Sequence, residues 1–151
     1  MEIKKVSTGG IKFLIHEEGL RLKPYLCGGG VPTIGVGCTF YPDGRKVKLS
    51  DPTISEEQAI AMFQSVLTHF ERKVSALTRD DINQNQFDAL VSLCFNIGTA
   101  GFEKSTLLRL VNSNPSDPAI QQAFEAWKNA SGKPILLDRR KREYRLYTKA
   151  V

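Results

Sequence analysis

The distribution of glycine constrains the fold of this chain more than any other sequence feature. Half of its twelve glycines lie between residues 28 and 44, in a segment that contains GGG, TIGVG and the turn YPDG. Glycine and proline at this density predict tight turns between short strands and argue against a regular helix. Residues 22–49 are therefore predicted to form a small β region.

Helical signals lie on both sides of this β region. Before it, Ser7 or Thr8 can cap a short helix, and Gly19 can end that helix in a left-handed conformation. After it, Ser55 and Gln58 have the spacing of a capping box. They predict a long helix over residues 55–74 that links two lobes.

The second half of the chain reads as helical throughout. Asn83 can cap the next helix. We predict that this helix is a core helix, because its apolar residues Phe87, Leu90, Val91, Cys94 and Phe95 form a stripe too apolar for a surface position. Three more helices are predicted over 102–112, 118–128 and 135–149, and Asp117 is the expected cap of the second. The predicted fold class is α+β, predominantly helical.

Composition and charge restrict the class of protein. With 151 residues, 41% of them hydrophobic and 25% charged, the chain has the composition of a globular domain. Seven basic and two acidic residues lie in 133–151, so this tail accounts for the whole net charge of +5. The tail predicts either a polyanionic partner or a solvated helix face.

Targeting signals and cysteine usage indicate where the protein works. No apolar stretch approaches the roughly 18 to 20 residues of a membrane span, and the start MEIKKVSTGG has no signal-peptide core. Three cysteines are too few for a disulfide framework. We therefore expect synthesis in a reducing cytoplasm.

Glu18 is the first candidate for chemistry. It continues the stripe of Ile11, Leu14 and Ile15 into the last helical turn. Lost hydration and the helix dipole would both favour the neutral acid there, which is the form that a general acid needs. The alternative is a glutamate that points to solvent or pairs with Arg21.

The segment around Glu18 resembles the active-site segment of phage-type lysozymes, the bacteriophage endolysins of glycoside hydrolase family 24. The shared signature is Glu, eight residues, Asp or Cys, five residues and Thr, which here falls on Glu18, Cys27 and Thr33. The resemblance continues through QFDALVSLCFNIG, FEKSTLLRLVN, Trp127 and the pair Arg139–Arg140. It covers most of the chain in order.

The resemblance implies one lysozyme-like domain over 1–151. Its lobes would comprise residues 12–55, and 75–151 with 1–11, joined by the helix 55–74. It also implies cleavage of the β-1,4 bond between N-acetylmuramic acid and N-acetylglucosamine in peptidoglycan, for host lysis and phage release. Glu18 would be the general acid, with Cys27 and Thr33 placing the water or the anomeric carbon.

Cys27 departs from the more familiar pattern, in which many relatives have Asp. Glycosidases ordinarily use two carboxylates, about 6.5 to 9.5 Å apart when inverting and about 5 to 5.5 Å apart when retaining. A thiol with an ordinary pKa of about 8.5 is mostly neutral at pH 7, and a cation that lowered this value would oppose the oxocarbenium. We expect Cys27 mainly to position water, with a thiolate base or nucleophile as the alternative and the stereochemistry open.

Other cysteines are expected to have structural roles. Cys38 stands where relatives commonly have His, and a packed thiol is the preferred interpretation. Cys94 lies within the apolar stripe of the core helix and should be inert. The spacing of Cys and His matches no zinc site, so we predict no metal and no cofactor.

The resemblance assigns further residues to the substrate. Asn96 and Gly98 match positions on the cleft floor, where an amide can bind an N-acetyl group, although helix capping would also explain them. Arg139 matches a cleft arginine that pairs with the catalytic Glu. Trp127 is interpreted as a core residue, with stacking on a sugar as the alternative.

Two other functions remain as alternatives. A nucleic-acid-binding module would use the basic tail, but no base-reading motif accompanies RRKREYRLY. A lytic transglycosylase needs one acid and no activated water. For the lysozyme we expect a monomer that binds peptidoglycan and no nucleic acid, and that stays in the host cytoplasm until a holin-type pore admits it to the wall.

Overall fold

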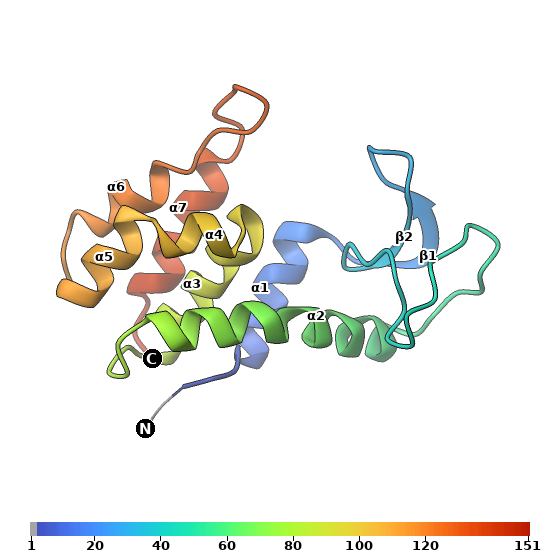
Figure 1. The fold of residues 1–151 in the computed structure, drawn as a ribbon, viewed down its shortest axis with the longest axis horizontal. Coiled ribbons are helices and arrows are strands. Elements are labelled where there is room, and N and C mark those ends of the chain that lie inside the picture. Colours follow the sequence, from blue (N-terminus) through green and yellow to red (C-terminus); the bar gives the residue numbers. More distant parts are fainter. Residues whose placement is uncertain (1–2) are drawn as a thin grey trace. The chain divides into compact units, whose positions relative to one another are not determined.

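A computed structural model describes residues 3–151 and divides the chain into two compact units. Residues 11–68 form one, here called the sheet unit, and residues up to 10 together with 69–151 form the other, here called the helical unit. The mixed fold confirms the predicted α+β class with helices predominating. Figure 1 shows the order of the elements along the chain.

The predicted β region is a small antiparallel hairpin followed by turns. Strands β1 (Arg21–Leu26) and β2 (Pro32–Gly35) pair with Tyr25 opposite Thr33. The register shifts between Arg21 and Tyr25, where Pro24 has no N–H to donate to a ladder. The following turns are closed by isolated bridges between Ile34 and Cys38 and between Phe40 and Lys46.

The sheet unit has its own apolar core. It contains Ile34, Cys38, Val47 and Met62, with Tyr41 and Ile54 packed against it. The alternation of β2 and the helical spacing of the next helix bring these side chains to the same interior. This core fixes the glycine-rich turns on which the candidate site lies.

Two helices begin at the predicted caps. The hydroxyl of Ser7 accepts the Gly10 N–H at 3.0 Å at the start of α1 (Thr8–Glu18), and Gly19, with φ +86°, donates its N–H to Ile15 at its end. In α2 (Glu56–Leu77), Ser55 and Gln58 exchange the capping-box hydrogen bonds at 3.0 and 2.8 Å. The long helix continues three residues beyond the predicted end.

The start of α1 is fastened by an aspartate. Asp88 accepts the N–H of Ser7 at 3.1 Å and its hydroxyl proton at 2.5 Å, and the amide of Gln84 donates to it as well. Asp88 is 1% exposed, and burial raises the pKa of its carboxyl while these three donors act in the opposite direction. A charged residue within an apolar stripe thus has a structural task.

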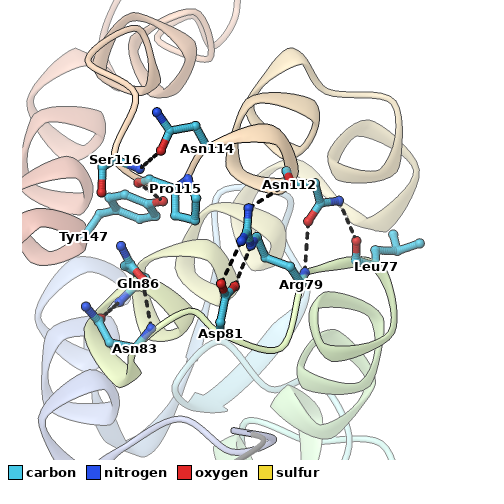
Figure 2. Close-up of polar contacts among 10 residues, drawn as sticks. All are labelled: Leu77, Arg79, Asp81, Asn83, Gln86, Asn112, Asn114, Pro115, Ser116 and Tyr147. Carbon is cyan, nitrogen blue, oxygen red and sulfur yellow. Dashed lines mark hydrogen bonds and ion pairs between the residues drawn. The ribbon is translucent and has the colours of Figure 1, made fainter.

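Helix α3 (Gln84–Ile97) is the core helix of the helical unit, as predicted. Asn83 caps it through a reciprocal pair of hydrogen bonds with Gln86, drawn in Figure 2. Its side chains from 87 to 94 are buried, and it packs against α7 (Leu137–Thr148), which also contacts α6 (Ile120–Glu125). Helix α7 also lies close to the range 135–149 that the sequence predicts.

Two helix predictions need correction. Residues 102–112 are not one helix, because Ser105 accepts the Leu108 N–H at 3.0 Å and starts α5 (Thr106–Ser113) after α4 (Thr99–Glu103) has ended. The helix predicted over 118–128 is only six residues long. There Asp117 accepts the Ala119 N–H at 2.9 Å and forms a turn before the helix instead of capping it.

A polar clamp joins the residues that follow α2 to the end of α5. Figure 2 shows the Arg79 guanidinium between the carboxylate of Asp81 and the backbone carbonyl of Asn112. The side chain of Asn112 in turn accepts the Arg79 N–H at 2.9 Å and donates to the carbonyl of Leu77. These bonds satisfy backbone groups at the exposed end of α2. Within residues 3–151 no helix is both long and apolar enough to cross a membrane.

Candidate active site

Glu18 is the last residue of α1 and belongs to the sheet unit. Of the two interpretations of its side chain, burial on the apolar stripe is wrong and exposure to solvent is correct, because Glu18 is exposed while Ile11 and Leu14 on the same stripe are buried. The helix ends at this residue and the chain turns away at Gly19, so the apolar stripe is not continued. Its carboxyl group is therefore open to a solvent-borne substrate.

Cys27 lies at the start of the GGG turn, directly after β1. Its backbone closes this turn, since its N–H donates to Val31 at 3.1 Å and its carbonyl accepts from Gly30 at 2.8 Å. The sulfur faces the inside of the same turn and remains partly exposed. A cysteine with this placement can meet a ligand or a reagent.

The pKa of the Cys27 thiol is lowered by neutral hydrogen-bond donors. The largest contribution comes from the Val31 backbone, followed by the Gly29 backbone and the Thr33 hydroxyl, and burial acts weakly in the opposite direction. The expected cause of such a shift was a neighbouring cation, whereas the donors here are backbone N–H groups and a hydroxyl. Neutral donors favour the thiolate without placing a positive charge beside a developing oxocarbenium.

Thr33 is buried on β2, with 2% of its surface exposed. Its hydroxyl donates to the Val31 carbonyl at 2.9 Å, and it is also one of the donors to the Cys27 sulfur. Two of the three signature residues are thus brought together by one turn. The proton of a single hydroxyl serves two acceptors, and rotation about the C–O bond decides which receives it.

The remaining cysteines have the environments expected of them. Cys38 is 5% exposed in the core of the sheet unit, and burial raises the pKa of its thiol. Cys94 is fully buried in α3, where desolvation raises its pKa to about 12. The predicted packing of Cys38 and burial of Cys94 are confirmed, and the inertness of Cys94 stays a prediction. The described residues hold no group of three or more His, Cys, Asp or Glu suited to a metal ion.

Asn96 and Gly98 lie in the helical unit at the end of α3. Gly98 has φ +94° and donates its N–H to the Cys94 carbonyl at 2.8 Å, so it caps the helix. The Asn96 side-chain carbonyl accepts a hydrogen bond from the Arg140 guanidinium. Because its oxygen faces an arginine, the NH₂ group of the same amide is left to donate elsewhere.

Arg139 and Arg140 are buried, at 7% and 0% exposure, although both belong to the basic tail. Both contact the carboxylate of Glu143, which is also fully buried. Three of the tail's nine charges are therefore not on the surface. The two interpretations of the tail, a polyanion-binding surface or a solvated face, both overestimated its exposed charge.

The buried cluster of Arg140, Glu143 and Ser92 was not predicted from the sequence. The signal for the first two was available, because Arg139 and Arg140 stand four and three residues before Glu143, the spacing of helical ion pairs. Ser92 could have been noticed as a hydroxyl within an apolar stripe. Its hydroxyl lies 2.5 Å from the Glu143 carboxylate.

Trp127 is half-buried in the helical unit, so its two interpretations stay open. A Cβ added to Gly101 would lie 3.3 Å from its ring. The indole therefore packs over a glycine of α4 that provides the space for it.

Comparisons with known proteins identify the family of this chain. The phage lysozyme family model matches residues 15–143. An endolysin from Salmonella phage P22 is 45% identical over 144 residues, which are 95% of this chain and 97% of that protein.

Solved structures give the same result. A crystal structure of a P22 lysozyme mutant superposes with a TM-score of 0.89 at 43% identity, covering 97% of this chain and 100% of that one. The muramidase domain of SpmX from Asticaccaulis excentricus has a TM-score of 0.77 at 32% identity, covering 98% of this chain and all of that domain.

Proposed function

The chain belongs to the phage lysozyme family, and from this premise we propose that it is an endolysin that hydrolyses the β-1,4 bond between N-acetylmuramic acid and N-acetylglucosamine. It is a lysozyme-type glycoside hydrolase of the peptidoglycan-degrading, bacteriolytic kind. The observation that carries the finer proposal is the exposed Glu18 in one compact unit with Cys27 and Thr33, at the family spacing.

In this proposal Glu18 is the general acid that protonates the departing glycosidic oxygen. Its exposed position at the C-terminal end of α1 lets a glycan reach the carboxyl group. A glycan that covers this group would exclude water from it, so the proton would be transferred within the bound complex.

Cys27 and Thr33 would act on the opposite side of the scissile bond. The Thr33 hydroxyl, whose proton is donated to the Val31 carbonyl, would offer an acceptor oxygen to one water molecule, and the Cys27 sulfur would be its second partner. The lowered pKa of the thiol supports the alternative of a thiolate that accepts a proton from this water. A serine at position 27 would keep the positioning and lose that basicity.

Asn96, Gly98 and Arg139 would contact the substrate. The free NH₂ group of Asn96 suits the carbonyl of an N-acetyl group. We further propose a monomer that needs no cofactor, stays in the host cytoplasm and reaches the wall through a separate holin-type pore. The burial of Arg139 and Arg140 makes the tail a poorer surface for nucleic acid than its sequence indicates.

Turbidity loss of permeabilised cells tests the acid. Glu18→Gln should abolish lysis while its circular dichroism spectrum and unfolding midpoint stay those of the parent. More than a few per cent of parental activity would remove Glu18 from this role. Cys27→Ser should keep partial activity, whereas complete loss, with parental activity sensitive to thiol alkylation, would support the thiolate mechanism.

Product analysis in oxygen-18 water tests the reaction. Mass spectrometry of the released muropeptides should show a reducing end that carries the heavy isotope. A 1,6-anhydro end without label would instead identify a lytic transglycosylase, the reaction that the missing second carboxylate leaves open.

A further inference from the structure

The carboxylate of Glu143 is the centre of a buried polar cluster in the helical unit. Its Oε1 accepts from Arg140 Nη1 at 2.7 Å, and its Oε2 accepts from the Ser92 hydroxyl at 2.5 Å and from Arg139 Nε at 3.3 Å. Glu143 and Arg140 are 0% exposed. Both carboxylate oxygens are thus used by groups of α3 and α7.

Stability alone does not explain this cluster. Burial raises the pKa of Glu143, while Arg140, Ser92 and Arg139 act in the opposite direction. Removing charged groups from water is costly, and well-packed apolar side chains often stabilise a core equally well. The cluster therefore calls for a second role, which its outer contacts indicate.

The outer contacts lead to the two side chains that the sequence assigns to the substrate. Arg139 is held directly, through its Nε on Glu143 and its Nη2 at 3.5 Å from Ser92 Oγ. Glu143 holds Asn96 indirectly, because Arg140 donates to Glu143 with Nη1 and to the Asn96 side-chain carbonyl with Nη2. Arginine can only donate, so this contact fixes which end of the Asn96 amide faces outward.

We propose that Glu143 is a positioning residue that orients Arg139 directly and Asn96 through Arg140 for contact with the glycan. The proposal rests on the proposed function, since it is that function which gives Asn96 and Arg139 a substrate. One buried carboxylate then sets two binding groups on different helices. Loss of this carboxylate should loosen both together.

Binding measured without turnover tests the proposal. The probe is sonicated, purified bacterial peptidoglycan, titrated into the Glu18→Gln protein by calorimetry. Adding Glu143→Gln should weaken its affinity by about tenfold, the lower end of the effect seen when a group that orients a metal ligand is lost. In the Glu18-containing enzyme the same change should raise KM more than it lowers kcat.

Asp88→Asn provides the matched control. Asp88 is also a buried acid of the helical unit, but its hydrogen bonds are to Ser7 and Gln84, away from the cluster around Glu143. It should lower the unfolding midpoint and leave the affinity unchanged. An equal loss of affinity in both variants would show that the cluster is only structural and would overturn the proposal.

Arg140→Lys keeps the test decisive if Glu143→Gln does not fold. Lysine keeps a cation beside Glu143 but lacks the planar fork whose two terminal nitrogens separately contact Glu143 and Asn96. The Asn96 side-chain NH₂ resonances should move in NMR spectra, and affinity should fall although Arg139 keeps its contact. Parental affinity in this variant overturns the Asn96 part. If the Glu18→Gln protein binds no peptidoglycan at all, the proposed function fails as well, which distinguishes the two failures.

Discussion

The hydroxyl of Thr33 helps to lower the pKa of the Cys27 thiol, although in the structure this hydroxyl donates its hydrogen bond to the Val31 carbonyl at 2.9 Å. The sulfur is otherwise surrounded by backbone N–H groups of the glycine-rich turn. As the thiol ionises, the hydroxyl can rotate from the carbonyl to the stronger acceptor. The ionisation of Cys27 is therefore coupled to the orientation of the Thr33 hydroxyl.

Alkylation of the three thiols measures this coupling. Cys27 should react with iodoacetamide at neutral pH far faster than Cys38 or Cys94, because its pKa is lowered and theirs are raised by burial. Peptide mass mapping at a series of pH values gives the half-point for Cys27, which should lie below the pKa of an unperturbed cysteine. Thr33→Val should raise this half-point and Thr33→Ser should not. Equal profiles for both variants would contradict the coupling.

Adjacent glycines at the start of α1 should respond in opposite directions to alanine. At Gly9 a new Cβ meets nothing closer than Ser7 Oγ at 3.8 Å, so Gly9→Ala should stabilise by up to about 1 kcal/mol through helix propensity. At Gly10 it would lie 2.5 Å from Val6 Cγ1 and 2.6 Å from Asp88 Oδ2. Gly10→Ala should therefore cost about 1–3 kcal/mol in urea unfolding, since Asp88 is held in place. The same sign for both variants would contradict this.

The cap that Ser105 forms between α4 and α5 should contribute to the free energy of unfolding. Its hydroxyl accepts the Leu108 N–H and donates to the Phe102 carbonyl, so Ser105→Ala should destabilise by about 1–2 kcal/mol. Ser113→Ala, at the exposed end of α5, serves as the control and should change the unfolding free energy by less than about 0.5 kcal/mol. Equal effects would show that the cap is dispensable.

Acid should weaken the clamp at Asp81. Hydrogen bonds from Arg79 hold the pKa of this carboxyl below its ordinary value of 3.8. The carboxylate thus favours the folded state; its contribution is complete above that value and disappears as the pH falls through the lowered pKa. Urea unfolding between pH 2 and 6 should give a smaller pH dependence for Asp81→Asn than for the parent. The neighbouring Asp80→Asn is the control, and parallel curves for parent and Asp81→Asn would contradict the linkage.

Local chemistry explains which parts of the fold were predictable. Ser7, Ser55 and Asn83 were recognised as caps because each bonds within three residues of itself. The break at Ser105 was missed because the apolar pattern continues across it. The signature Glu18, Cys27 and Thr33 came from family spacing, yet its electrostatics depend on the folded turn.

Long-range contacts explain the errors. The sequence alone placed Arg139, Arg140 and Glu143 on a basic tail, because their burial depends on Ser92 and Asn96, more than 40 residues away. The exposure of Glu18 likewise depends on where α1 ends relative to its core. Periodicity shows which side of a helix faces inward and not how far the interior extends along it.

The boundaries between the two units fall inside α1 and α2, between residues 10 and 11 and between 68 and 69. Neither unit could be exchanged by recombination on its own, since a crossover at either boundary would lie inside a hydrogen-bonded helix. That helix would then combine residues from two parents. Shuffling between relatives should therefore succeed only when both helices are inherited whole.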